Sequence, residues 1–201
     1  NTNLGTSHSN PEESGELYDG YRTLSGSGPS TWTHDHTPYG VYDLCGNVWE
    51  WLAGLRIMDG RIEVIENNNA ANPIDVGVQS PLWKPVLCGE KPTRFIAEGG
   101  NVRLTAIDEN FEDWDGCAWK DLQIDIEPPE LLKALALFPN NAENKESFLY
   151  IDSSDERLPL RGGSWNLGAN AGVFALNLNR ARSGSGSYIG FRAAYYRKTG
   201  N

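Results

Sequence analysis

Cysteine is scarce in this sequence, and the cysteines present are not spaced for cross-linking or for a structural zinc ion. Among 201 residues there are three, Cys45, Cys88 and Cys117, with no Cys-x-x-Cys pair. An odd number without paired spacing is not the pattern of a disulfide scaffold or of a zinc site. We expect Cys45, which lies in an apolar stretch, to pack as a small hydrophobic residue.

Positive charge and long apolar runs are also lacking. The 27 acidic and 17 basic residues give a formal net charge of -10, which argues against binding to nucleic acid or to an anionic membrane. No run approaches the ~20 apolar residues of a transmembrane helix, so we expect no direct membrane insertion. The chain shows no signal-peptide pattern and begins with Asn1 instead of Met, which we interpret as processing or a fragment. Its length suits a single domain over residues 1–201.

Residues 161–192, RGGSWNLGANAGVFALNLNRARSGSGSYIGFR, contain two interleaved sets of side chains. Glycines and apolar residues, among them Trp165, Phe174, Ile189 and Phe191, are mixed with asparagines and small polar residues. Neither a period of two nor a period near 3.6 is sustained, so we predict short strands joined by shaped loops. In this interpretation the apolar set anchors the backbone and the polar set forms a presented surface.

The ends of this stretch carry a family resemblance. RGGSW followed later by IGFR resembles the C-terminal part of the formylglycine-generating-enzyme branch of the C-type lectin fold. The sequence between these markers resembles the variable region of diversity-generating-retroelement target proteins. The resemblance implies an α+β, C-type lectin-like fold of the formylglycine-generating-enzyme subtype, loop-rich with short strands. In that family a segment usually precedes a stretch like residues 1–10, so we expect part of the first half of the fold to be missing from this sequence.

The residue types between 166 and 188 fit the resemblance. In such systems a reverse transcriptase randomises template adenines, so an asparagine codon can become Ser, Gly, Tyr, Arg, Leu or Ala. It cannot become Lys, Glu, Gln, Met or Trp, and none of these five occurs between residues 166 and 188. The alternative is that a short loop rich in Gly, Ser and Asn avoids them by chance.

A second motif, TPYGVYDLCGNVWEW at residues 37–51, is similar to the NxxGLYDMxGNVWEW signature of the same fold. Its apolar residues can share one buried side: Val41, Leu44, Val48 and Trp51. In the enzymes that it resembles, side chains and backbone carbonyls hold a calcium ion at the positions matching Asp43, Gly46, Val48 and Glu50. Oxygen ligands of this kind suit calcium. The alternative is that Glu50 caps neighbouring backbone N–H groups, and we expect no cofactor to be required.

Residues His34, Asp35 and His36 offer a further metal hypothesis, because alternate side chains of an extended segment share a face. The alternative is a pair of solvent-facing loop histidines. No GxSxG nucleophile elbow accompanies them, so no Ser-His-Asp site is indicated.

The segment between the two motifs gives weaker signals. Residues 55–66 predict a β-hairpin, with a type I′ turn at Asp59 and Gly60 and an alternating, half-buried pattern of apolar residues. Residues 67–155 are acidic and punctuated by proline, which we interpret as a large, loop-rich insertion. Within it, ELLKALALF between Pro129 and Pro139 predicts a short helix. Residues 190–196 predict a terminal strand.

Three classes of function compete. Formylglycine generation in the resembling enzymes needs paired cysteines late in the chain, and this chain has none after Cys117. A thiolate is the required nucleophile and soft-metal ligand, so we expect no enzymatic activity. A calcium-dependent lectin commonly shows EPN or QPD beside WND, and neither occurs here. The remaining class is a binding protein with a retroelement-diversified surface; a formylglycine-generating-enzyme-like or other lectin-fold module with a fixed ligand or carbohydrate is the alternative.

The resemblance assigns ligand binding to residues 161–192 and, within them, to one set of side chains: Asn166, Leu167, Asn170, Ala175, Asn177, Asn179, Arg180, Ser183, Gly184, Ser185, Gly186, Ser187 and Tyr188. Among these, Arg180 and Tyr188 are the expected hot spots, because Arg and Tyr are enriched at such sites. The partner would be a protein or another cell-surface ligand, and the protein would lie on a phage particle or a bacterial surface. Neither the ligand's identity nor an oligomeric state follows from the sequence.

Overall fold

Strands dominate the structure, a computed structural model that describes residues 23–109, 111–138 and 146–193. About 39% is strand and 12% is helical, so the fold is β-rich with short helical elements, and it is not clearly the α+β class expected from the sequence. The helical elements are short, the longest α-helix being α1, and no helix in the described part of the chain has the length and apolarity to cross a membrane. The helical elements of the described residues are the 3-10 turns Ser30–Trp32, Glu66–Ala71, Trp119–Asp121 and Gly168–Asn170, and the α-helix α1 (Glu130–Ala134).

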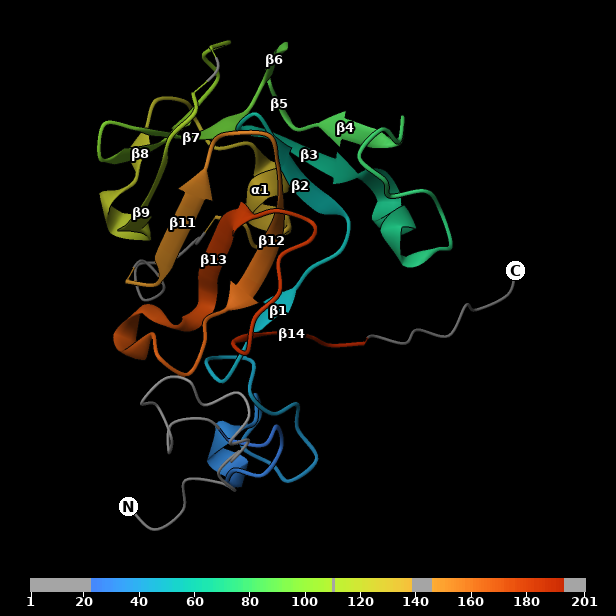
Figure 1. Cartoon of the computed structure of the whole chain (residues 1–201), viewed down its shortest axis with the longest axis vertical. Helices are drawn as coiled ribbons and strands as arrows, with labels where there is room; N and C mark the ends of the chain where they lie inside the picture. Colours follow the sequence, from blue (N-terminus) through green and yellow to red (C-terminus); the bar gives the residue numbers. More distant parts are fainter. Residues whose placement is uncertain (1–22, 110, 139–145, 194–201) are drawn as a thin grey trace.

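Twelve of the strands join into one curled sheet (Figure 1). The strands of the described residues are β1 (Trp49–Trp51), β2 (Leu55–Met58), β3 (Arg61–Ile65), β4 (Trp83–Pro85), β5 (Leu87–Cys88), β6 (Lys91–Pro92), β7 (Arg94–Glu98), β8 (Asn101–Thr105), β9 (Trp114–Ala118), β10 (Gln123–Ile124), β11 (Phe148–Asp152), β12 (Glu156–Gly162), β13 (Gly172–Arg180) and β14 (Ile189–Phe191). Their order across the sheet is β10-β8-β7-β3-β2-β12-β13-β11-β9, with β1 joined to β12 and β14, and β4 joined to β3. Strands β5 and β6 form a separate ribbon.

The predicted hairpin is confirmed as β2 and β3. Strand β2 pairs antiparallel with β3, and Asp59 and Gly60 connect them with φ angles of 49° and 78°. Two central residues with positive φ are what a type I′ turn requires, and Asn, Asp and Gly tolerate that conformation best. The expectation of a half-buried hairpin is wrong, however, because Arg56 and Glu63 are buried on the face opposite Ile57 and Ile62.

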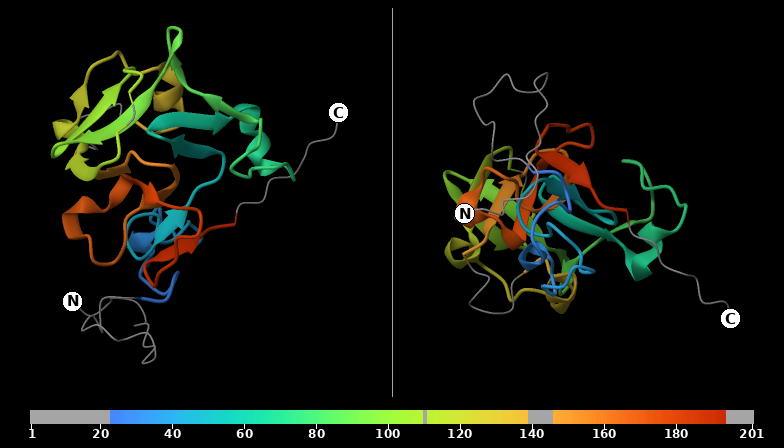
Figure 2. Two further views of the ribbon diagram at one scale, coloured as in Figure 1. Left: turned by 45° about the horizontal axis from the view of Figure 1, so that its top comes forward. Right: turned by 90° about the horizontal axis from the view of Figure 1, so that it is seen from below.

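The main core lies inside the curl of the sheet. It combines residues from both ends of the strand order: Leu55, Ile57, Ile62, Val64, Val86, Phe95, Ala97, Val102, Leu104, Trp119, Leu122, Leu132, Leu137, Leu149, Ile151, Leu176 and Leu178. Figure 2 shows the green and yellow strands packed over the orange ones. A hydrogen bond from the Ala97 N–H to Ser153 Oγ (2.7 Å) ties the two sides together, as does one from Trp119 Nε1 to the Phe174 carbonyl (2.8 Å).

The segment 67–155, expected to be a loop-rich insertion, contains short strands separated by loops in its described part. Eight strands, β4 to β11, lie within it, and their residues supply a large share of the main core. Each strand is at most five residues long and lies close to a proline, a glycine or an acidic residue, so no single run shows a sustained period. The predicted helix is confirmed but short: α1 spans Glu130–Ala134, and the positive φ of Ala136 (51°) follows its end.

Strand β14 ends the sheet beside β1, where the sequence predicts a terminal strand. It pairs in parallel with β1, Trp49 opposite Ile189 and Trp51 opposite Phe191. The predicted strand ran to residue 196, and residues 194–196 lie outside the described part of the chain. Phe191 was expected to anchor this strand in the core, but its side chain is 79% exposed, so that expectation is wrong.

Candidate ligand-binding face

The surface of the sheet opposite the main core carries a row of residues from four adjacent strands. Tyr150 in β11 pairs with Asn177 in β13, Asn177 with Leu160 in β12, and Leu160 with Trp51 in β1. Side chains in register on neighbouring strands share a face, so these four residues define what we term the outer face. A second, smaller apolar cluster covers it: Trp49, Leu160 and Ala175, with Trp51, Tyr150, Leu167, Tyr188 and Ile189 packed against them.

A bulge in β13 adds Arg180 to the outer face. Leu160 pairs with Asn177 and Leu158 with Arg180, so β13 has one residue more than β12 between these pairs. Without the bulge Arg180 would point to the main core, because successive side chains of a strand alternate. The Asn177 side-chain oxygen accepts the N–H of Asn179 at 2.9 Å, which satisfies a backbone donor at the bulge.

Arg180 and Tyr188 form the polar centre of this face. Nη2 of Arg180 donates to the Tyr188 hydroxyl at 3.0 Å, and the guanidinium lies 5.6 Å from the ring centroid. Two polar atoms beside them, Arg180 Nε and Asn179 Oδ1, are buried without a hydrogen-bond partner in the described structure. Buried polar atoms are rarely left in this state, so the pair is a candidate contact point for a ligand or a water molecule.

The loop 181–188 crosses the outer face and is fixed at both ends (Figure 1). At its start, Nε and Nη2 of Arg182 donate to the Glu156 carboxylate at 2.9 and 2.8 Å. At its end, the Tyr188 carbonyl accepts the Trp49 N–H at 2.8 Å. Between these points the exposed residues are Ser183, Ser185, Gly186 and Ser187. The loop therefore presents a small polar tip on rigid supports.

Glu156 belongs to a buried charge network beneath the start of the loop. Arg56 donates to Glu63 at 2.7 Å and to Glu156 at 2.9 Å, and it stacks over the Trp83 ring at 4.6 Å. Burial by itself raises the pKa of Glu156, but hydrogen bonds and charge attraction from Arg182 and Arg56 outweigh it and hold that pKa below its ordinary value.

A second loop, residues 164–171, borders the same face. Ser164 Oγ donates to the Asn166 side chain at 2.7 Å, while Leu167 packs into the outer cluster. Asn170 hydrogen-bonds the Tyr150 hydroxyl; burial raises the pKa of Tyr150, and this bond partly offsets the rise. Tyr150 also packs edge-on against Trp49, with ring centroids 6.1 Å apart.

The residues assigned to binding from the sequence fall into three groups by exposure. Exposed are Asn166, Ser183, Ser185, Gly186 and Ser187; half-buried are Leu167, Asn170, Asn179, Arg180, Gly184 and Tyr188. Ala175 and Asn177 are buried, with 0% and 6% exposure, so the expectation that they present their side chains is wrong. The outer cluster and the bulge cover these positions of β13. Tyr150 and Trp51 join the face without a sequence signal, since only the strand pairing brings them there.

The predicted anchors differ in burial. Phe174 packs against the main core, and Ile189 packs against the outer cluster. Trp165 is half-buried, and its backbone N–H donates to the Asn47 carbonyl at 2.9 Å. The backbone of the 161–165 motif is therefore held by the segment around residue 47.

The residues matched to a calcium site are engaged with protein groups. Both carboxylate oxygens of Glu50 accept from Arg192, at 3.0 and 2.6 Å, and Oδ2 of Asp43 accepts the Gly26 N–H at 2.9 Å. The Gly46 N–H donates to the Gly162 carbonyl. Arg192 therefore competes with any calcium ion for Glu50, and the described residues contain no group of three or more His, Cys, Asp or Glu side chains that could hold a metal. The alternative expected for Glu50 was that it caps backbone N–H groups. In its place the structure shows an ion pair between the Glu50 carboxylate and Arg192.

The motif around residues 37–51 is also less buried than expected. Val41 and Leu44 are exposed, and Val48 and Trp51 are half-buried, so the single buried side predicted for them is wrong. Cys45 is exposed as well, which overturns its expected burial. Of the three histidine-motif residues, His34 accepts the Val41 N–H through Nδ1 at 2.9 Å, and Asp35 accepts N–H and hydroxyl bonds from Thr37.

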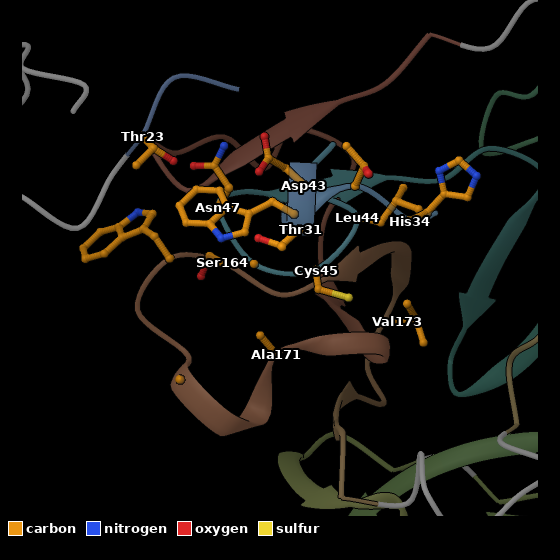
Figure 3. Close-up of a pocket in the computed structure, with 15 residues that line it drawn as sticks. Thr23, Thr31, His34, Asp43, Leu44, Cys45, Asn47, Ser164, Ala171 and Val173 are labelled. Atoms are coloured by element: carbon orange, nitrogen blue, oxygen red, sulfur yellow. The ribbon is translucent and has the colours of Figure 1, made fainter. Parts of the chain in front are cut away.

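A pocket of about 670 Å³ separates this motif from the second loop (Figure 3). Asp43 and Asn47 lie on one side of it, and Ala171 and Val173 lie on the other. Its lining is mixed: Thr23, Thr31, Trp32, Thr33, His34, Asp43, Leu44, Cys45, Gly46, Asn47, Ser164, Trp165, Gly168, Ala171 and Val173. Its volume lies within the range of small-molecule sites.

The protein is therefore β-rich, and the loop 181–188 covers an outer face that contains Tyr, Asn and Arg side chains. Comparison with models of known protein families and with curated proteins finds no match for this chain.

Proposed function

We propose that this protein binds a ligand without catalysing a reaction, and that a retroelement reverse transcriptase diversifies the surface formed by residues 161–192. The proposal includes the C-type lectin-like fold of the formylglycine-generating-enzyme branch, whose RGGSW and IGFR markers the sequence carries. The observation that carries it is the loop 181–188, which is held by Arg182 at its start and Tyr188 at its end while its tip is exposed.

The chemistry of the outer face supports binding. Tyr supplies a rigid contact area, and Ser, Gly and Asn supply adaptable hydrogen bonds, as in antibody loops. Arg180 and Tyr188 lie together at its centre, and both residue types are enriched among binding hot spots. Because changes at the exposed loop tip remove no core contact, that tip can vary while the sheet stays folded.

The partner is a protein or another cell-surface ligand, met by a receptor or adhesion protein on a phage particle or a bacterial surface. Formylglycine generation is disfavoured because the chain has no cysteine after Cys117, where the resembling enzymes carry their catalytic pair.

A display library tests the proposal on the scaffold itself. Asn166, Ser183, Ser185 and Ser187 would be randomised together and selected against a panel of unrelated purified proteins. We expect most variants to fold and the library to yield binders to several targets. A control library randomised at other exposed polar positions, Asn101, Glu112, Lys120 and Gln123, should yield markedly fewer.

Two results would contradict the proposal. If the face library unfolds, these side chains are structural; if the control library gives as many binders, the face has no special capacity. The retroelement part has its own test: the neighbouring DNA should hold a near-copy of the segment for residues 161–192, differing at adenines, beside a reverse transcriptase.

The pocket of about 670 Å³ favours the alternative, a lectin-fold module with a fixed ligand or carbohydrate. Most of its lining comes from residues 23–47, outside the segment that would vary. A missing near-copy in the neighbouring DNA would favour this alternative.

A further inference from the structure

Almost every arginine of the described structure has an acidic partner. Ion pairs to Asp or Glu are formed by Arg56, Arg61, Arg94, Arg103, Arg157, Arg182 and Arg192. This is expected of a chain with a formal net charge of -10, in which carboxylates outnumber cations. The described arginines outside this set are Arg161 and Arg180, and their surroundings differ.

Arg161 is committed to the fold. Its Nη1 and Nη2 donate to the carbonyls of Val173 and Ala136 at 3.0 and 2.6 Å, and it lies 6.0 Å from the Phe174 ring centroid. Burial lowers the pKa of Arg161 to about 10. Its bonds tie β12 to β13 and to the end of α1, so both of its terminal nitrogens hold backbone carbonyls of the fold.

Arg180 is differently placed. The Tyr188 hydroxyl takes one of the five N–H donors of its guanidinium, and Nε is buried without a partner in the described residues. Its neighbours on the outer face, Asn177, Asn179 and Tyr188, are uncharged, and residues 166–188 include no acid. A half-buried guanidinium without a carboxylate has lost part of its hydration and has gained no ion pair in return.

We propose that Arg180 is the anion subsite of the outer face and binds a carboxylate of a protein partner, an Asp or Glu side chain or a chain terminus. This inference rests on the proposed binding function and names the chemistry that the face recognises. A carboxylate matches the planar N–H fork of arginine, and the amide of Asn179 and the hydroxyl of Tyr188 lie beside it to accept or donate further bonds. A polyanion such as nucleic acid fits poorly, because the rest of the chain is strongly acidic.

NMR of the Arg side-chain Nε–Hε groups tests the subsite directly. Labelled protein would be titrated with the blocked peptide acetyl-Gly-Glu-Gly-amide, and the Arg180 signal would be assigned by its absence in Arg180→Gln. We expect that signal to move saturably. A matched peptide with Gln in place of Glu should leave it unmoved, and acetyl-Gly-Gly-Gly with a free carboxyl terminus distinguishes a terminal carboxylate from a side-chain one.

Arg182 is the internal control, since it lies two residues away and already holds Glu156 with two bonds. Its Nε–Hε signal should stay in place. The Arg180→Gln variant, whose folding is checked by its melting curve, is titrated with the same Glu peptide and followed by the backbone amide of Tyr188. The peptide affinity obtained from that shift should be at least about tenfold lower than in the parent protein.

Three results would overturn the inference: no saturable movement at Arg180, equal movement with the Gln peptide, or equal movement at Arg182. The display library separates this inference from the function on which it rests. Binders from the library with a silent Arg180 would refute the subsite alone, whereas a responsive Arg180 without binders would refute the diversified-face function alone.

Discussion

Replacing Glu156 by Gln should weaken the fold much more than replacing its surface partner Arg182 by Gln. Glu156 and Arg56 are both less than a tenth exposed, whereas the Arg182 side chain is 38% exposed. Breaking a buried pair by removing one charge costs about 3–5 kcal/mol, while an exposed pair is worth about 0–1 kcal/mol. Because Gln keeps a hydrogen bond and water reaches Arg182, we expect about 2–3 kcal/mol for Glu156→Gln and at most about 1 kcal/mol for Arg182→Gln.

Thermal unfolding measures the difference. For a chain of this length, 1 kcal/mol shifts the melting temperature by about 2–4 °C. Glu156→Gln should therefore melt about 5–10 °C below the parent protein, and Arg182→Gln no more than about 4 °C below it. Equal losses in the two variants would refute the view that the buried Arg56 contact is the stabilising one.

Acid supplies an independent check on the same carboxylate. The folded-state pKa of Glu156 is lowered, so its contribution is fully present above the unfolded-state pKa and is lost as the pH falls through the folded-state value. The stability gap between the parent protein and Glu156→Gln should be constant from pH 7 to about pH 5 and should shrink below about pH 4. A gap that persists at low pH would show that the charge is not its origin.

Three further predictions concern other parts of the molecule. Asn177→Ala should cost about 1–3 kcal/mol, because it leaves the Asn179 N–H without its acceptor at the bulge, and a melting curve like that of the parent would contradict this. Chelator should leave the melting temperature unchanged, since Arg192 already occupies both oxygens of Glu50, and a fall in melting temperature would reveal a bound ion. Cys117 should react more slowly with a thiol reagent at pH 8 than an unperturbed cysteine, because burial, Asp121 and Asp115 raise its pKa to about 11 and leave about a hundredfold less thiolate; equally fast labelling would contradict that pKa.

The local features of the fold could be predicted from the sequence, and the long-range ones could not. The Asp59-Gly60 turn and the start of α1 after Pro129 depend on a few adjacent residues, and both were found. Strand β11 spans five residues and pairs with β9 and β13, which lie far from it in the chain. That pairing is decided by tertiary packing, which local pattern does not report. Strand β7 is a different case, because Gly99 and Gly100 connect it directly to its partner β8, and this local turn signal was missed.

The same division holds for the candidate site. The tip of loop 181–188 was predicted from its small polar residues, and it is exposed. The burial of Ala175 and Asn177 was missed because it depends on the outer cluster, and the ion pair between Glu50 and Arg192 joins residues 142 positions apart. Tyr150 is assigned to the outer face only because it lies in register with Asn177, and the sequence alone does not show that pairing.

The bulge of β13 makes strand register at this point as important as residue identity. It lets the strand send Leu178 to the main core and Arg180 to the outer face within three residues. Pairing without the bulge would set Asn179 opposite Leu158, turn the guanidinium of Arg180 toward Leu176 and Leu178, and shift Arg182 by one residue relative to Glu156. The composition of the outer face therefore depends on where the bulge lies as well as on which side chains β13 carries.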